Sequence, residues 1–128
     1  MYTPYVSAEE YKNLGYTTIP EGERAKMLKK ASRHIDSLTY NRIVGKGFDG
    51  LTEFQQEIIK EVVCNQADFE YDNQDMLDSI LSSYSINGTS MTLESGWKLY
   101  IEQGAAIKME NYALLKQTGL CCRVLRGY

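Results

Sequence analysis

The sequence contains one histidine, His34, whose side chain could serve as a general base or a metal ligand. A general base needs a positioned partner, and a zinc site needs further ligands at a suitable spacing. The neighbouring Asp36 and Ser37 provide neither arrangement clearly. We therefore expect His34 to be a structural residue at the surface or at the rim of the core.

The three cysteines, Cys64, Cys121 and Cys122, are an odd number and contain no C-x-x-C motif. Two of them are adjacent, which makes a poor disulfide framework and fits a reducing compartment. A zinc site would have to recruit the single histidine from far away in the sequence. The pattern favours structural thiols in a protein made in the cytosol.

Two further stretches have the composition of ligand-binding loops. Residues 72–78 (DNQDMLD) lack the alternating ligands, central glycine and final glutamate of a calcium-binding EF-hand loop. Residues 45–50 (GKGFDG) lack the lysine followed by serine or threonine of a phosphate-binding P-loop. We predict no metal, no cofactor and no enzymatic activity. A minimal site at His34 or in the acidic stretch is the remaining catalytic alternative.

Length and composition favour one globular domain. The chain has 128 residues, 43% hydrophobic and 24% charged, enough for one modest core. We expect residues 1–128 to form a single domain with residues 120–128 as a C-terminal tail. The net charge is −3, from 14 Lys and Arg against 17 Asp and Glu, which argues against a nucleic-acid clamp. With no signal peptide and no apolar run near 18 residues, we expect no export and no membrane partner.

Hydrophobic periodicity and capping signals predict a mainly α fold. We expect a helical bundle of about four helices, with a small β-hairpin or a three-stranded antiparallel sheet inserted before the last helix. Ser7 with Glu10, and Thr52 with Gln55, have the spacing of capping boxes. The predicted helices lie at residues 8–14, 20–38, 52–72 and 108–118, with Gly15 and Gly119 as stops. Residues 41–50 are predicted to be a loop.

Two of these helices carry apolar stripes with a helical period. In the helix at 20–38 the stripe is Ala25, Leu28, Ala31, Ile35 and Leu38, and the basic residues Arg24, Lys26, Lys29, Lys30 and Arg33 are expected on other faces. In the helix at 52–72 the stripe is Phe54, Ile58, Val62, Asn65 or Gln66, and Phe69, widened by Ile59, Val63 and Cys64. The second of these helices is predicted either to be the most buried helix or to pack on two sides.

Asn87 and Gly88 give the strongest hairpin signal in the chain, since a type I′ turn needs positive φ at both central residues. The predicted strands carry Tyr84 and Ile86 before this turn, and Met91 and Leu93 after it. Residues 97–101 alternate as a further strand. A two-stranded ribbon leaves edges that can pair with another chain.

Ten tyrosines provide large apolar area with a polar tip, which suits surfaces that become buried in an assembly. Tyr84, Tyr100 and Tyr128, on the predicted strands and the tail, are the interface candidates among them.

The ordered set of segments 9–16 (EEYKNLGY), 32–43 (SRHIDSLTYNRI), 51–55 (LTEFQ), 82–88 (SSYSING) and 114–120 (LLKQTGL) resembles the head-tail connector, or adaptor, proteins of tailed phages and prophages. The resemblance implies a ring, usually twelve-fold, beneath the portal vertex. Such a ring extends the DNA channel and binds the portal protein and a head-completion or tail-terminator protein. By this resemblance, the subunits are made in the bacterial cytoplasm and the ring lies at the head-tail interface of the virion. Double-stranded DNA passes through the channel of the ring without sequence-specific binding.

In such families, loops and the C-terminal segment contact the portal and neighbouring subunits. The resemblance, together with the hairpin and the tyrosines, indicates these interface residues: Tyr84, Ser85, Ile86, Asn87, Gly88, Thr89, Ser90, Met91, Tyr100, Leu120, Arg123, Leu125, Arg126 and Tyr128. The alternative is a small helical regulatory module of a phage or host, whose hairpin contacts a protein target.

Overall fold

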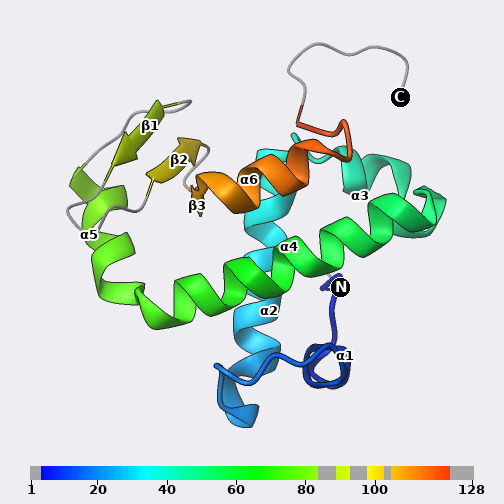
Figure 1. Cartoon of the computed structure of the whole chain (residues 1–128), viewed down its shortest axis with the longest axis horizontal. Helices are drawn as coiled ribbons and strands as arrows, with labels where there is room; N and C mark the ends of the chain where they lie inside the picture. Colours follow the sequence, from blue (N-terminus) through cyan, green and yellow to red (C-terminus); the bar gives the residue numbers. More distant parts are fainter. Residues whose placement is uncertain (1–3, 84–88, 93–97, 103–104, 122–128) are drawn as a thin grey trace.

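The computed structural model describes residues 4–83, 89–92, 98–102 and 105–121, and this part of the chain is mainly helical with a small antiparallel sheet before the last helix (Figure 1). The predicted fold class is confirmed. The elements are α1 (Ala8–Asn13), α2 (Glu21–Leu38), α3 (Arg42–Lys46), the 3-10 helix η1 (Phe48–Gly50), α4 (Glu53–Asp72), α5 (Gln74–Ser83), β1 (Thr89–Thr92), β2 (Lys98–Glu102), β3 (Ala105–Lys108) and α6 (Met109–Lys116). Figure 1 shows α2 crossing α4, and the sheet at one end of the molecule.

Both predicted capping boxes are present. At the start of α1, Ser7 Oγ accepts a hydrogen bond from the Glu10 amide (3.1 Å), and Glu10 Oε1 accepts one from the Ser7 amide (3.3 Å). Thr52 and Gln55 make the equivalent pair at the start of α4. Glu10 Oε2 also lies 2.6 Å from Lys60 Nζ. The same glutamate therefore caps α1 and ties it to α4.

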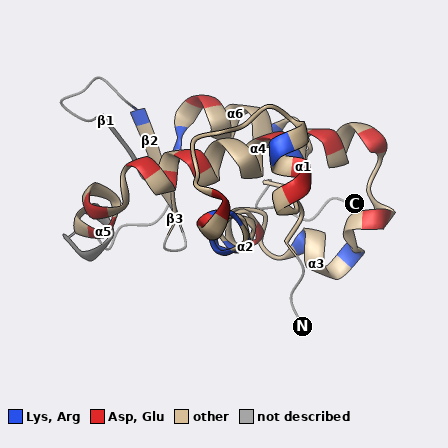
Figure 2. Ribbon diagram, turned by 90° about the horizontal axis from the view of Figure 1, so that it is seen from below, with Lys and Arg blue, Asp and Glu red and all other residues tan. Residues whose placement is uncertain are grey.

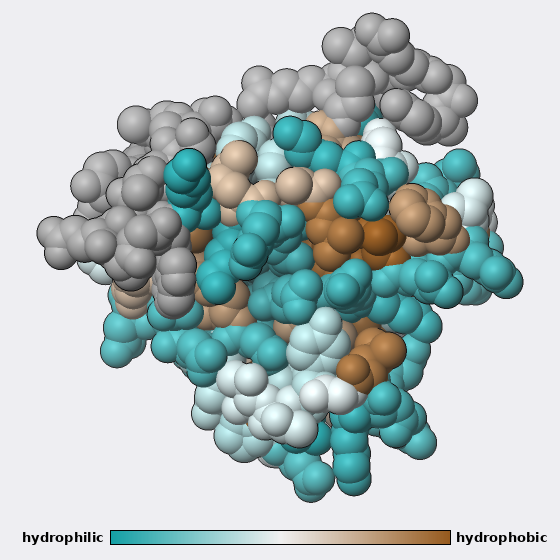
Figure 3. Space-filling model, in the orientation of Figure 1, coloured by the Kyte–Doolittle hydropathy of each residue, from teal (hydrophilic) through white to brown (hydrophobic). Residues whose placement is uncertain are grey.

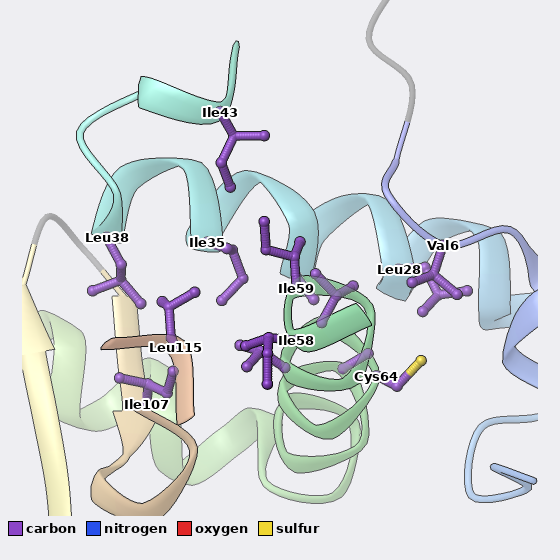
Figure 4. Packing of buried hydrophobic residues seen from close by; sticks show 14 of the residues in the cluster. Val6, Leu28, Ile35, Leu38, Ile43, Ile58, Ile59, Cys64, Ile107 and Leu115 are labelled. Atoms are coloured by element: carbon purple, nitrogen blue, oxygen red, sulfur yellow. The ribbon is translucent and has the colours of Figure 1, made fainter. Parts of the chain in front are cut away.

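The main core forms where α2 crosses α4, and α6 and β3 pack against this crossing (Figure 4). Its fully buried side chains include Leu28, Ile35 and Leu38 of α2, Ile43 of α3, Ile59 of α4, Ile107 of β3, and Leu115 of α6. Most of these α2 and α4 positions belong to the stripes predicted from periodicity. The crossing of the two long helices is therefore the framework on which the other elements pack.

The sheet has the order β1-β2-β3, and both pairings are antiparallel. Leu99 and Ile101 are buried while Lys98 is exposed, which confirms the predicted alternation along this strand. In β3, Ala105 and Ile107 join the main core, whereas Ala106 joins a second cluster. The second cluster consists of Phe69, Leu77, Leu99, Ile101 and Ala106. Because β3 is covered on both faces, its small alanines allow close packing on each side.

The predicted turn at Asn87 and Gly88 lies outside the described residues, as do Tyr84, Ile86 and Leu93. Strand β1 pairs with β2, with Thr89 opposite Ile101 and Thr92 opposite Lys98. The described hairpin therefore uses the segment that was predicted as the additional strand, and β3 is the third strand of the sheet.

Two predicted loops contain helices. Residues 41–50 form α3 and η1, because Tyr40 and Asn41 adopt positive φ (55° and 59°) and turn the chain so that Ile43 enters the core. In the acidic stretch, α4 ends at Asp72 and α5 begins at Gln74. Burial of Leu77 anchors α5 against the sheet. Six α-helices are thus present in the described ranges, against the four predicted.

Three residues lie on other faces than predicted. Arg24 is buried, its Nε donates to the Ile19 carbonyl (2.7 Å), and its guanidinium lies 5.1 Å from the centre of the Tyr11 ring. Ala25 is exposed because α2 packs through Met27 and Leu28 instead. Phe54, in the first turn of α4, is 55% exposed.

The end of the chain follows the prediction more closely. Helix α6 covers most of the predicted 108–118 range, and Tyr112 and Leu115 are buried. Gly15 after α1 and Gly119 after α6 have φ of 95° and 77°, the left-handed region in which glycine carries no Cβ penalty.

We expect Ile59→Ala to lower the free energy of unfolding by about 2–5 kcal/mol, because it leaves a cavity at the crossing of α2 and α4. Urea denaturation followed by circular dichroism measures this change. Phe54→Ala is the control and should change the free energy of unfolding much less, since Phe54 is exposed in the subunit. Equal losses would contradict the described packing.

Candidate functional site

Part of the predicted interface lies outside the described residues, namely Tyr84, Ser85, Ile86, Asn87, Gly88, Arg123, Leu125, Arg126 and Tyr128. Thr89, Ser90 and Met91 belong to β1. Tyr100 is half-buried and stacks on Tyr112 of α6, with ring centres 4.3 Å apart. Leu120 was predicted as a contact, but it is 1% exposed and packs in the main core. Its carbonyl accepts a hydrogen bond from Arg42 Nη1 (3.1 Å), so Leu120 is a core residue.

Strand β1 forms one edge of the sheet. It is hydrogen-bonded to β2 on one side, and no other strand of the described part of the chain pairs with its second side. Such an edge can pair with a strand of another chain. Figure 1 places β1 at one end of the long axis of the molecule. We call Thr89–Thr92 the sheet edge, and it is a candidate contact surface.

Exposed apolar side chains mark the opposite end of the molecule. Val44 on α3 is 58% exposed and Phe54 on α4 is 55% exposed. Figure 1 shows α3 and the start of α4 far from the sheet, and Figure 3 shows hydrophobic surface on this half of the molecule. We call Val44 and Phe54 the apolar end. Leu14, 53% exposed, belongs to the C-terminal end of α1, on another part of the surface.

A buried polar cluster joins α2, α4 and β3. His34 Nδ1 lies 2.5 Å from Glu70 Oε2. Gln66 Nε2 donates to the same carboxylate oxygen and to the Ala106 carbonyl, both at 2.8 Å. Gln66 and Glu70 are 1% and 4% exposed. The partner that His34 lacked in its sequence neighbourhood is therefore supplied by α4.

A histidine oriented by a carboxylate could assist a nucleophile. The small cavity beside this pair, about 70 Å³, is lined by Lys30, His34, Glu70, Gln74, Leu77, Asp78 and Ala106. The His34–Glu70 pair joins α2 to α4, and Gln66 joins Glu70 to the backbone of β3. The cluster therefore holds the sheet against the two long helices.

A larger groove of about 680 Å³ lies between the second half of α4 and α6. Its lining combines apolar surface with polar side chains, which include Asn65, Asp68, Asp72, Lys108, Glu110 and Asn111. Asn111 Nδ2 donates to the Val62 carbonyl (3.1 Å), and Asn65 Nδ2 donates to Asn111 Oδ1 (3.3 Å). These amides are thus already used within the subunit, and they hold α6 on α4.

Burial shifts the pKa of several groups near α1 and α4. Desolvation raises the pKa of Asp68, and the hydrogen bond from the Tyr11 hydroxyl partly opposes this. Burial, with the hydrogen bond to Asp68, raises the pKa of Tyr11 to about 12. Burial raises the pKa of the Cys64 thiol to about 12 as well, and the charges of Asp68, Glu10 and Glu61 act in the same direction. Cys64 therefore stays protonated at neutral pH and is a poor nucleophile.

Comparison of the chain with family models, curated proteins and solved structures finds no match. In the described ranges, no group of three or more His, Cys, Asp or Glu side chains is placed to hold a metal ion. None of the described helices combines the length and apolar character needed to cross a membrane.

We expect Gln66→Leu to lower the free energy of unfolding by about 1–3 kcal/mol, because Glu70 and the Ala106 carbonyl each lose a buried donor. Denaturation measures the loss, and amide hydrogen exchange should show faster exchange in β3 than in α1. The matched control is Gln74→Leu, at an exposed position of α5, which should change stability by less than about 0.5 kcal/mol. If amide exchange became faster by the same factor in α1 and in β3, the idea that Gln66 forms a local junction between α4 and β3 would be contradicted.

Ionisation of the buried Cys64 thiol is expected to lower the free energy of unfolding in alkaline solution. Its folded pKa of about 12 lies above the ordinary value of 9.0, so its contribution is intact below pH 9 and is lost as the pH rises toward 12. The slope from one such group reaches about 1.4 kcal/mol per pH unit. In denaturation series from pH 8 to pH 11, Cys64→Ala should show a shallower decline than the wild type. Parallel curves would show that Cys64 does not contribute.

Proposed function

We propose that this chain is a structural subunit that assembles into a ring at the head-tail junction of a tailed phage or prophage. The ring extends the DNA channel beneath the portal and joins it to a head-completion or tail-terminator protein. The ordered segments that resemble head-tail connector proteins support this assignment, and so does a helical bundle with a small sheet at one end.

The observation that carries the proposal is the placement of two different candidate contact surfaces at opposite ends of the long axis. The sheet edge lies at one end and the apolar end, Val44 and Phe54, at the other (Figure 1). A ring built from head-to-tail contacts requires two unlike surfaces on each subunit, and it closes when the rotation between neighbours completes a circle. The sheet edge of one subunit would then meet the apolar end of the next.

Charge also supports a channel protein. The net charge of −3 limits tight, sequence-independent binding to DNA phosphates. DNA can then move through the ring without being retained. We propose a twelve-fold ring in the virion, assembled from subunits made in the host bacterial cytoplasm.

The groove between α4 and α6 favours a second candidate function. A concavity of about 680 Å³, with both polar and apolar lining, is large enough for a peptide segment of a partner. This would suit a small regulatory module of a phage or its host that acts as a monomer.

Substitution of the apolar end tests the ring. We expect Val44→Gln with Phe54→Gln to weaken assembly by tenfold or more, because each buried apolar side chain contributes about 1.5–3 kcal/mol. Sedimentation of the purified chain, alone and mixed with portal particles, measures the assembled fraction. Circular dichroism checks that the helical content of the subunit is unchanged.

Leu14→Gln is the matched control, since Leu14 is equally exposed but lies outside both surfaces, and it should leave assembly unchanged. A wild-type chain that stays monomeric at all concentrations, alone and with portal particles, would overturn the ring and favour the regulatory module. Equal loss of assembly in the control would overturn the role of the apolar end.

A further inference from the structure

One face of α2 carries a continuous basic stripe that the core does not use. Lys26, Lys29, Lys30 and Arg33 are all exposed and recur at the spacing i, i+3, i+4, i+7. At 100° per residue they fall within an arc of roughly 100°. This arc lies opposite Leu28 and Ile35, which face the core. The stripe therefore points away from the subunit interior.

The stripe is a local concentration of positive charge on an acidic protein. Figure 2 shows basic residues on the side of α2 that points away from α4, while acidic residues are present on α4 and α5. Gly22 and Ser37 are neutral and lie in the same arc. Among the described residues, acidic groups lie at its margins, including Glu23 on α2 and Asp78 of α5, which lines the small cavity shared with Lys30. Arg33 also takes part in an interaction within the subunit. The carboxylates of Asp36 and Glu70 face inward, bonded to Tyr5 and His34.

The spacing of these cations suits a regular row of phosphates. Along the helix axis Lys26 and Lys30 are separated by about 6 Å, and Lys26 and Arg33 by about 10 Å. Along one strand, a DNA duplex carries one phosphate per roughly 3.4 Å of its axis. Two or three phosphates can therefore face the stripe at once, and lysine heads on flexible stems adapt to their positions.

We infer that this stripe is a contact surface for the phosphate backbone of duplex DNA, bound weakly and without reading of base sequence. Ammonium groups on an exposed helix face contact phosphates but carry no sequence information. The inference deepens the proposed function by naming the surface that faces the passing DNA. The stripe lies on α2, which crosses the long axis, so head-to-tail contacts at the two ends leave it uncovered (Figure 1).

The test measures binding of the full chain to a fluorescein-labelled 20-base-pair duplex by fluorescence anisotropy between 50 and 200 mM salt. Each lost phosphate contact reduces the magnitude of the negative slope of log K against log salt by about 0.9. Lys26→Gln with Lys29→Gln should therefore make this slope shallower by about 2 and weaken binding. Two duplexes of different sequence should bind equally.

Lys12→Gln with Lys46→Gln removes the same charge from exposed positions on α1 and α3, and it should leave the slope unchanged. No binding at 50 mM salt, or an equal loss in both double variants, would overturn the inference. Sedimentation of the same variants reports assembly separately. Lost DNA binding with intact assembly would thus be distinguished from failure of the ring itself.

Discussion

The hydrogen bonds of the Gln66 side chain hold the small sheet on the two long helices, α2 and α4. Gln66 leaves α4 near the crossing with α2 and donates both to Glu70 and to the backbone of β3. Glu70 in turn contacts His34 of α2. A buried N–H donor costs free energy unless it is bonded, so the two bonds of Gln66 Nε2 fix where β3 meets the helices. The position of β1, and with it the sheet edge, follows from that junction.

Local signals predicted the elements that local chemistry decides. The capping boxes at Ser7 and Thr52, the stop at Gly119, and the alternation of Leu99 and Ile101 all depend on residues within a few positions of each other, and all are present. Periodicity also placed Ile35, Leu38 and Ile58 on the core face of their helices. One signal of the polar junction was visible in the sequence: Gln66 falls on an otherwise apolar face.

The features that were missed depend on partners far away in the sequence. His34 finds Glu70 36 residues later, and Arg24 is buried because the Ile19 carbonyl and the Tyr11 ring receive it. Leu120 enters the core while Arg42 holds its carbonyl. In α3 and α5, burial of Ile43 and Leu77 outweighs glycine and acidic composition. Contact surfaces are hard to predict for the same reason. Val44 and Phe54 are exposed because no distant segment of the described chain packs over them, and the local sequence does not reveal this.

The central claim, a head-to-tail ring, is tested most directly by cross-linking between neighbouring subunits. A chain with Cys121→Ala and Cys122→Ala would carry Ser90→Cys at the sheet edge and Val44→Cys at the apolar end, and a short bis-maleimide would join them. We predict a ladder of linked subunits in the variant with both new cysteines, and only background in each variant with one. If the variant with Val44→Cys but without Ser90→Cys became linked, two apolar ends would be in contact, and the head-to-tail account would be contradicted. The absence of a ladder in the variant with both cysteines would contradict it too.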